Sequence, residues 1–599
     1  LLSTNFIGLI INCCVLLSAL FILLLLPGYP FFFVIFKNKR FNVLEKLSFT
    51  LIIDLSFYII GGFIAFYLKI PLTGLYFLIL TLTFFSLFLI YILYQEIRFG
   101  EFYFFRLRKK EKENVISHHN NSIWRYFQEK LSLNGLLFLV FLMLMLCIII
   151  LSVPFFGGTD SWLHISIIKV ISEVNILPLE EYLGAMGLHI YSVVFHFFSG
   201  IDLLLIPRFF TLYSFPVSLL IVYNLFRRIF KNKNVVIFGL YLLIFSSLGF
   251  TIMNYQFWPS AIAFIQGLFI FYLLYTRFKI SIKVAPPSIE EIKNDMLFNY
   301  ISIVIVFISA LLTHSLIIMI LLISYLWIYA IYFIKNWKRG LDFILLCALF
   351  GIFLIFNAFN ISTGHFNVFN SFFRLPWYVI IGGLSITLGL VLILIWHQVR
   401  VINFTSGKYR LILEGKLYGY YKKIEDKFLY PIIFGITLGL TLSWVVINYF
   451  WFNMPIVTIN TGAEILIISL LSIWGIGLYQ NKPKGKILLI WGLSLVFLVL
   501  IGFIFDVINN SYTLFSRIFY LCSVVIAIGF LSYIYKVIKI GSIRTLKVKL
   551  LLLIIITFSV LATLTEEVNS IEIFSLKKVK SLQFNGMLNI IPITSQTRT

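Results

Sequence analysis

Carboxylate and imidazole side chains gather in one short stretch of an otherwise strongly apolar chain. The stretch runs from Gly157 to His189 and reads GGTDSWLHISIIKVISEVNILPLEEYLGAMGLH. Its candidate reactive groups are Asp160, His164, Glu180, Glu181 and His189. A carboxylate can act as a general base or hold a metal ion, and an imidazole can bind phosphate or move a proton. Because ionisable groups are scarce in the surrounding apolar segments, this stretch is the candidate functional site.

A new helix is predicted to begin at Asp160. The tripeptide Gly157-Gly158-Thr159 breaks the preceding apolar segment, and Thr159 suits the N-cap position. Asp160 and His164 are four residues apart and therefore share one face of this helix, which we expect to end near Leu177-Pro178. An acid in a first turn also interacts favourably with the helix dipole. The position of Asp160 among histidines, at the end of an apolar segment, favours a functional role.

Glu180 and Glu181 have two interpretations. They form either a solvated loop pair or a group that orients an acceptor or a metal ion. Asp160 with Glu181 is a weak site for a divalent cation, so Mg²⁺ or Mn²⁺ stays open as a cofactor. Two histidines spaced on one helix as zinc ligands are absent from this stretch, so we do not expect zinc.

The composition predicts an all-α polytopic membrane protein. Of 599 residues, 61% are hydrophobic and 12% are charged, and the mean hydropathy is +1.02. Soluble domains carry about 25% charged residues, and apolar runs of about 20 residues have the length of membrane-spanning helices. The net charge of +23 comes from basic residues in short loops, which indicates membrane topology and contact with anionic lipid rather than nucleic acid.

The loop charges predict about sixteen transmembrane helices. Four segments are expected: an N-terminal three-span accessory module (residues 1–94), a cytosolic basic segment (95–130), a membrane core (131–537), and a last span with a short outer tail (538–599). Because the basic segment is placed inside, the next span leads to a large outer loop at residues 154–203. Within this loop, Leu188–Gly200 is predicted as a juxtamembrane helix lying along the membrane surface.

Two later features are expected at the same outer face. Thr313-His314 interrupts an apolar stretch that otherwise runs from Ile301 to Trp327. Arg517 opens a predicted span from the outer side, where it is either a snorkelling anchor or a bidentate ligand for a lipid phosphate. On this topology five of the eight histidines lie outside: His164, His189, His196, His314 and His365.

These residues carry a family resemblance. A span leading into Gly-x-Asp-x-x-x-His, a stretch of leucine, proline, glutamate and tyrosine, and then Gly-Leu-His-Ile resembles the first outer loop of the GT-C glycosyltransferases. Those are polytopic enzymes that use polyprenyl-phosphate-linked sugars. The resemblance implies that Asp160 is the catalytic base or a metal ligand, and that Thr313-His314 and Arg517 lie near the lipid-phosphate site. The candidate residues for an acceptor or a metal are Glu180, Glu181 and His164, and those for the donor phosphate are Arg517, His314 and His189. Gly187 departs from the family, which often has proline there.

The expected function is therefore inverting transfer of one sugar from a polyprenyl-phosphate donor to an acceptor hydroxyl. The protein is expected in the plasma membrane with its active site facing outside. Its expected partners are the lipid-linked donor, membrane lipid, and a glycan, lipid or protein acceptor. A first alternative is a transporter or flippase for a lipid-linked or anionic solute, with Asp54 and Glu464 as intramembrane acids. A second alternative is a non-catalytic scaffold of an envelope complex.

Overall fold

The computed structural model describes a large part of the chain, and every regular element in that part is a helix. The described residues are 26–29, 43–99, 159–179, 185–230, 232–255, 257–280, 289–333, 340–358, 430–451, 456–477, 483–509 and 514–540. The prediction of an all-helical chain is confirmed within these ranges. Glu180, Glu181, His365 and the predicted basic segment at residues 95–130 lie outside them, apart from the end of one helix at Phe99.

Six helical stretches in the described residues are long and apolar enough to cross a membrane. They are Leu44–Tyr67, Gly74–Tyr91, Pro259–Thr276, Ile459–Gly477, Ile487–Ile504 and Ile518–Lys536. Each spans at least 18 residues, close to the length that a bilayer core requires. These helices indicate a membrane-embedded protein, whereas the count of sixteen spans stays a prediction.

Contacts divide the chain into two compact units. The first comprises Leu1–Leu240, Thr251–Lys408 and Tyr479–Val525. The second comprises Tyr241–Phe250, Tyr409–Leu478 and Ile526–Thr599. The predicted site residues Asp160, His164, His189, His314 and Arg517 all belong to the first unit.

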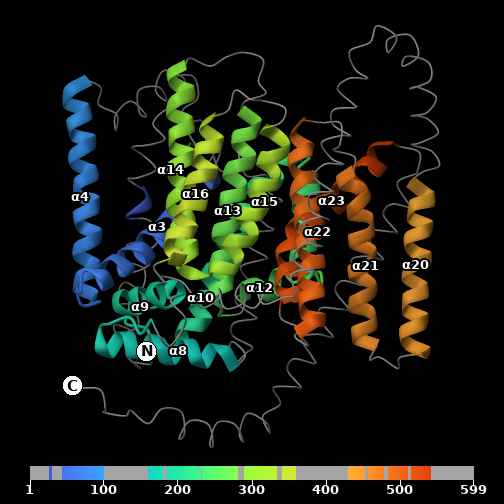
Figure 1. The fold of residues 1–599 in the computed structure, drawn as a ribbon, viewed down its shortest axis with the longest axis horizontal. Helices are drawn as coiled ribbons and strands as arrows, with labels where there is room; N and C mark the ends of the chain where they lie inside the picture. Colours follow the sequence, from blue (N-terminus) through green and yellow to red (C-terminus); the bar gives the residue numbers. More distant parts are fainter. Residues whose placement is uncertain are drawn as a thin grey trace, which may run out of the picture. The chain divides into compact units, whose positions relative to one another are not determined.

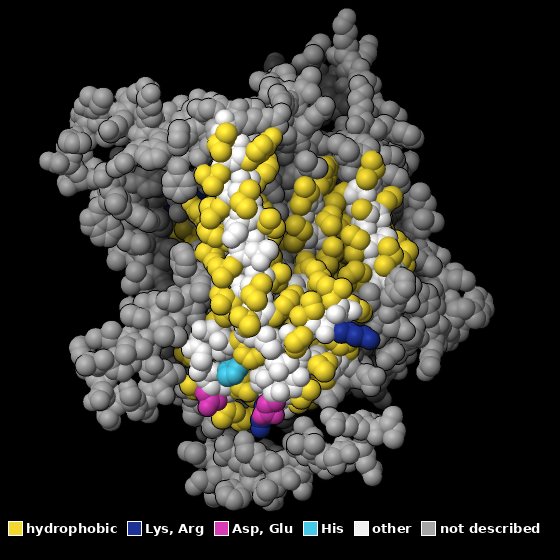
Figure 2. Space-filling view, turned by 90° about the vertical axis from the view of Figure 1, so that its left-hand side faces the viewer, with side chains coloured by type: hydrophobic (Ala, Val, Ile, Leu, Met, Phe, Trp, Pro, Cys, Tyr) yellow, Lys and Arg dark blue, Asp and Glu magenta, His cyan; other side chains and the backbone are white. Residues whose placement is uncertain are grey.

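The two N-terminal helices coincide with two of the three predicted N-terminal spans. They are α3 (Val43–Tyr67) and α4 (Gly74–Phe99), at the left of Figure 1. Most of α3 is buried, whereas α4 exposes a long apolar surface that includes Leu75, Ile79 and Ile90. In Figure 2 apolar side chains cover this side of the unit, and the charged and histidine side chains lie towards one end.

Upright apolar helices form the body of the first unit (Figure 1). They are α13 (Pro259–Ile280), α14 (Ile289–Thr313), α15 (Ser315–Phe333), α16 (Gly340–Ala358) and α22 (Pro483–Asn509). Helix α14 ends at Thr313 and α15 begins at Ser315. The predicted interruption at Thr313-His314 is therefore confirmed.

Two short helices run across the direction of these upright helices, at one end of them (Figure 1). They are α8 (Thr159–Val174) and α9 (Gly187–Ser199), and α8 packs on α9. Helix α9 has nearly the bounds predicted for the segment Leu188–Gly200, whose position at the membrane surface stays a prediction. It is capped by Gly200 with a left-handed φ of 63°, where glycine carries no Cβ penalty. Helix α8 stops at Val174, earlier than predicted, because Asn175 adopts a positive φ of 59°.

The remaining helices of the described chain complete the two units. They are η1 (Leu203–Leu205), α10 (Ile206–Ile229), α11 (Lys233–Phe245), α12 (Phe250–Tyr255), α20 (Tyr430–Phe450), α21 (Ile456–Gly477) and α23 (Leu514–Ile540). In the second unit α21 meets the C-terminal part of α23 without space for a side chain. A Cβ added at Gly475 would collide with the Gly529 carbonyl oxygen, and one at Gly529 with Ser472. Small residues allow this close approach, as is common between membrane helices.

One buried ion pair joins three helices of the first unit. Arg228 of α10 contacts Glu45 Oε1 of α3 through Nη2 at 2.5 Å and donates to it through Nε at 2.7 Å. The hydroxyl of Tyr272, on α13, donates to the same oxygen at 2.7 Å. Glu45 is 2% exposed and Arg228 is 30% exposed at the side chain. We call Glu45, Arg228 and Tyr272 the three-helix clamp.

Replacing Glu45 by alanine is expected to destabilise the protein, because it leaves Arg228 and Tyr272 without their shared acceptor. Removing one partner of a buried ion pair costs about 3–5 kcal/mol, and the partial exposure of Arg228 puts this case near the lower figure. Thermal unfolding in detergent measures the change. The control is Glu173→Ala, because Glu173 pairs with Lys169 at 3.8 Å with both side chains 63% exposed, and such a pair is worth at most about 1 kcal/mol. Equal melting temperatures in the two variants would contradict the prediction.

Candidate functional site

The predicted base, Asp160, lies in the first turn of α8. Helix α8 begins at Thr159, so Asp160 is its second residue. The structure describes the backbone of Asp160 but not its side chain. Acidic residues in the first turn of a helix interact favourably with the helix dipole. An ionised carboxylate is the form that accepts a proton from a hydroxyl.

A buried pair of histidines joins α8 to α9. His164 Nδ1 lies 3.0 Å from His189 Nε2, within hydrogen-bond distance. The ring centroids are 5.0 Å apart, and the side chains are 2% and 0% exposed. Both histidines are predicted site residues, but nothing in the sequence indicates that they contact each other. The pair fixes the distance between the two crosswise helices one turn after Asp160.

Burial makes these two histidines weak bases. Desolvation lowers the pKa of His164 to about 4. Burial, with a smaller contribution from His164, also holds the pKa of His189 well below its usual range. Both imidazoles are therefore neutral at pH 7, and one ring can donate the shared hydrogen bond while the other accepts it. Neutral imidazoles offer hydrogen bonds to a phosphate but no positive charge.

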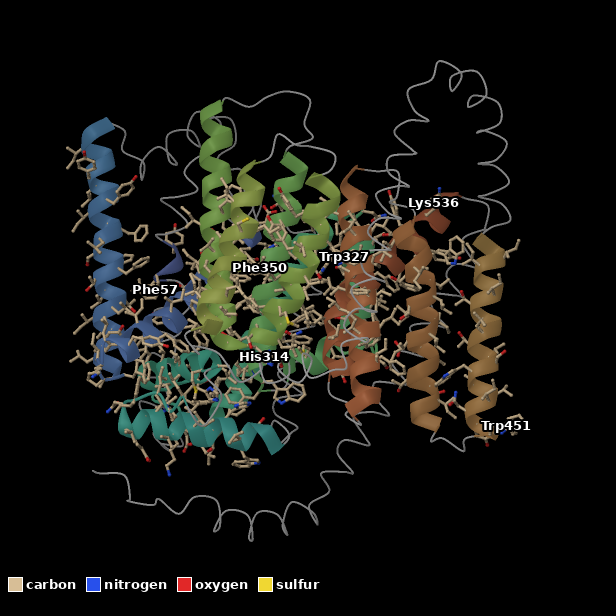
Figure 3. All side chains as sticks on the ribbon, viewed as in Figure 1. Phe57, His314, Trp327, Phe350, Trp451 and Lys536 are labelled. Atoms are coloured by element: carbon tan, nitrogen blue, oxygen red, sulfur yellow. The ribbon has the colours of Figure 1, made fainter. Side chains whose placement is uncertain are left out.

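The start of α9 lies directly against the end of α14. Gly187, the first residue of α9, is so close to Thr313 that an added Cβ would collide with its side chain and its Cα. Thr313 is followed by His314, which is 3% exposed and lies in the break between α14 and α15 (Figure 3). Two distant parts of the sequence thus meet at one end of the first unit: the consecutive helices α8 and α9, and the Thr313-His314 break.

A small buried polar network near this end was not predicted. The Ser214 hydroxyl of α10 donates to the Asn254 carbonyl oxygen at 2.5 Å, and the Ser218 hydroxyl donates to Asn254 Oδ1. Asn254 belongs to α12 and is 0% exposed. Three residues later in the sequence, the Phe257 ring packs edge-on against His164, with 6.1 Å between centroids. In the sequence, the pattern that could have indicated this network is the pair of serines four residues apart within an apolar helix.

Other predicted site residues are not brought into this group by the described structure. Arg517 is the fourth residue of α23, and its side chain lies outside the described residues, as do Glu180 and Glu181. Among the described residues, no cluster of three or more His, Cys, Asp or Glu side chains forms a metal site. The possible Mg²⁺ or Mn²⁺ site at Asp160 and Glu181 remains a prediction.

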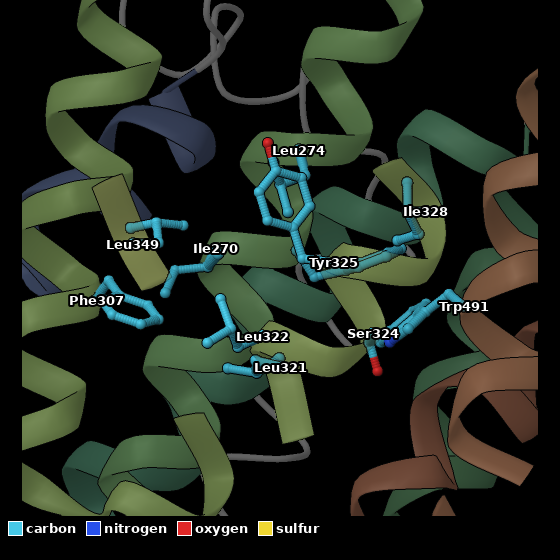
Figure 4. Close-up of a pocket in the computed structure, with 11 residues that line it drawn as sticks. Ile270, Leu274, Phe307, Leu321, Leu322, Ser324, Tyr325, Ile328, Leu349 and Trp491 are labelled. Carbon is cyan, nitrogen blue, oxygen red and sulfur yellow. The ribbon is translucent and has the colours of Figure 1, made fainter. Parts of the chain in front are cut away.

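An apolar pocket lies among α13, α14, α15, α16 and α22 (Figure 4). Its volume is about 20 Å³, and Phe307, Tyr325 and Trp491 are among its lining side chains. Such a volume accommodates about one water molecule or methyl group. An isoprenoid chain would enter only if these helices separate.

Two acids inside apolar helices are fully enclosed. Asp54, in α3, is 0% exposed and accepts the backbone N–H of Gly28 at Oδ1. Glu464, in α21, is 3% exposed and accepts the Ser247 N–H at 3.3 Å and the Ser247 hydroxyl at 2.7 Å. Ser247 lies in the interruption between α11 and α12, where Gly249 has a φ of 82°. Both acids therefore bind backbone N–H groups of a neighbouring segment.

The comparisons with known proteins identify no relative. No protein-family model matches the chain, and no curated protein or solved structure is similar to it.

Acidification is expected to loosen the contact between α8 and α9. A base whose pKa is lower in the folded state binds fewer protons there than in the unfolded chain, so folding stability falls as the pH drops from about 6.5 towards 4. Hydrogen exchange of the α8 and α9 amides at pH 7 and pH 5 measures the opening. The double variant His164→Gln with His189→Gln should show a smaller pH dependence, and an unchanged pH dependence would contradict the assignment.

Proposed function

We propose that this chain is a membrane glycosyltransferase of the GT-C type. It transfers a sugar from a polyprenyl-phosphate donor to an acceptor hydroxyl at the outer face of the membrane, with inversion. The observation that carries the proposal is the pair of crosswise helices α8 and α9, held together by His164 and His189 with Asp160 in the first turn of α8. Helix α9 is in turn packed against Thr313, next to His314.

In the proposed reaction, Asp160 takes the proton of the acceptor hydroxyl as the oxygen attacks the anomeric carbon. The bond to the phosphate oxygen breaks on the opposite face of the sugar, and polyprenyl phosphate leaves. Phosphate is a competent leaving group, so one carboxylate suffices, unlike the two that glycoside hydrolysis requires. Glu180 or Glu181 would orient the acceptor, and a Mg²⁺ or Mn²⁺ ion remains an open addition.

Charge develops on the phosphate as the bond breaks, and the proposal assigns its stabilisation to Arg517 and His314. A guanidinium binds phosphate through two parallel hydrogen bonds. His164 and His189 are neutral and buried, so in this proposal they contribute hydrogen bonds and position α8. The polyprenyl tail would lie along apolar helix surfaces, for which the exposed apolar side chains of α4 are candidates.

Replacing Asp160 by asparagine is expected to lower the turnover number by about 10²–10⁴-fold, since this is what general-base catalysis contributes. The purified protein in liposomes is given a polyprenyl-phosphate-sugar extract, and release of free polyprenyl phosphate is followed by mass spectrometry. The matched control is Asp202→Asn. Asp202 is exposed and its side chain accepts the Leu204 N–H at the start of η1, so this variant should keep wild-type turnover.

Equal turnover in wild type and Asp160→Asn would contradict the role of Asp160. Absence of polyprenyl phosphate release from the wild-type protein, with a range of donors and with Mg²⁺ or Mn²⁺ added, would contradict the transferase as a whole.

Glu464 supports a second candidate, a transporter or flippase for a lipid-linked or anionic solute. Carboxylates within membrane-spanning helices are costly and usually functional, and transporters place their sites at interrupted helices. Glu464 combines both features, because it binds Ser247 in the interruption between α11 and α12.

If transport is the function, Glu464→Gln should reduce movement of a fluorescent lipid-linked sugar across the liposome bilayer at least tenfold. The amide still accepts a hydrogen bond from Ser247 but carries no charge. A quencher added outside the liposomes measures the movement, and Glu173→Gln, at an exposed position, is the control. Movement at the wild-type rate in Glu464→Gln, or none in the wild type, would contradict transport through this site.

A further inference from the structure

Asp54 lies in the middle of a membrane-spanning helix without any contact with solvent. It belongs to the apolar stretch Leu44–Tyr67 of α3, and its side chain is 0% exposed. One carboxyl oxygen, Oδ1, accepts the N–H of Gly28, which follows a turn at Leu26-Pro27. The two backbones are close, since a Cβ added at Gly28 would collide with the Thr50 carbonyl oxygen. The segment around Gly28 therefore binds one of the two carboxyl oxygens of Asp54.

The other carboxyl oxygen, Oδ2, is buried and has no hydrogen-bond partner. Helices α4, α9, α10 and α14 pack against α3. In the described part of these helices, no lysine, arginine or histidine pairs with Asp54, and the basic partner of α3, Arg228, is bound to Glu45. Asp54 is thus a buried carboxyl without a counter-charge among the described side chains.

Three tyrosines lie close enough to Asp54 to be influenced by its charge, and they come from three helices: Tyr58 of α3, Tyr191 of α9 and Tyr213 of α10. The Tyr213 hydroxyl donates to the Leu51 carbonyl oxygen of α3 at 3.3 Å and is also hydrogen bonded to Tyr191. The Tyr58 hydroxyl is bonded to Thr81 Oγ1 of α4 at 3.2 Å. These hydroxyls tie α9, α10 and α4 to α3 around the carboxyl.

An ionised carboxylate in this place is strongly unfavourable. Removing an ion from water costs several kcal/mol even after the protein relaxes, unless an opposite charge or several donors compensate. Asp54 has one N–H donor and no opposite charge. A bound proton removes the net charge, needs no additional space, and turns Oδ2 into a hydroxyl.

We propose that Asp54 is a proton-binding site, whose carboxyl is protonated at neutral pH while α9 and α10 are packed against α3. Loss of the proton leaves a carboxylate that requires water, and water reaches the buried Oδ2 when a helix packed against α3, such as α9 or α10, separates from it. Proton release is thereby coupled to the position of α9, the helix that carries His189. The inference does not depend on sugar transfer or on transport.

The first experiment compares the thermal unfolding of the purified full-length protein with that of Asp54→Asn between pH 5 and pH 9. Asparagine is a neutral isostere of the protonated acid and keeps an oxygen for the Gly28 N–H. A group that holds its proton in the folded state and releases it on unfolding lowers the folded-to-unfolded ratio about tenfold per pH unit. The melting temperature of the wild type should therefore fall with rising pH relative to Asp54→Asn. Asp202→Asn, at an exposed acid, should follow the wild type.

A second measurement keeps the proposal testable if the variant does not fold. Infrared spectroscopy of the wild type detects the carbonyl stretch of a protonated carboxyl, which shifts in D₂O and moves again in Asp54→Glu. Parallel pH curves of the wild type and Asp54→Asn, or the absence of such a band at pH 7, would overturn the proposal. If NaCl stabilises the wild type but not Asp54→Asn, relative to N-methylglucamine chloride, the site binds Na⁺ and not a proton. This result would likewise overturn the proposal.

Discussion

The structure depends on one constraint, the absence of water from the apolar interior in which most of its helices lie. A polar group there must find its partner on another helix or remain unpaired at a cost of several kcal/mol. Most of the buried polar side chains in the described chain are serines and threonines. Those with long-range partners hold the helices together. Glu45 joins α3, α10 and α13 in the three-helix clamp, Glu464 binds the interruption after α11, and Gln266 donates to Ser309 between α13 and α14 at 2.8 Å. Each of these hydrogen bonds favours the observed packing, because another arrangement of the helices would leave its donor and acceptor unpaired.

The same constraint separates two kinds of polar residue at the end that carries α8 and α9. His164 and His189 are removed from water and are neutral, so they act by holding the crosswise helices together. Asp160 lies at a helix end, where N–H groups and water can stabilise charge. Proton abstraction, as proposed, requires an ionised group, whereas two buried imidazoles without a counter-charge hold helices together in their neutral form. The division of roles between these residues therefore follows from their environments and not from their proximity in the sequence.

Much of the helical layout could be predicted from apolar runs and loop charge. The helices α3, α4 and α9 and the break at His314 follow directly from hydropathy and from polar residues that interrupt it. Contacts between distant segments could not be predicted, because a single sequence contains no pairing information. The contact of His164 with His189, the close approach of Gly187 to Thr313, and the role of Asn254 are of this kind. Helix α8 ends at Val174, before the predicted end near Leu177-Pro178, because the positive φ of Asn175 cannot be detected from hydropathy.

The contact between Gly187 and Thr313 has a mechanical consequence. Because Gly187 has no side chain, the start of α9 can contact the end of α14 at Thr313. The hydrogen bond between His164 and His189 connects α9 in turn to α8. The consecutive helices α8 and α9 are therefore connected to the end of α14, which lies more than 100 residues later in the chain, and Gly187 is the point of contact. If a ligand that tilts α8 also moves Thr313 through these contacts, binding at either place changes the affinity at the other by the same factor.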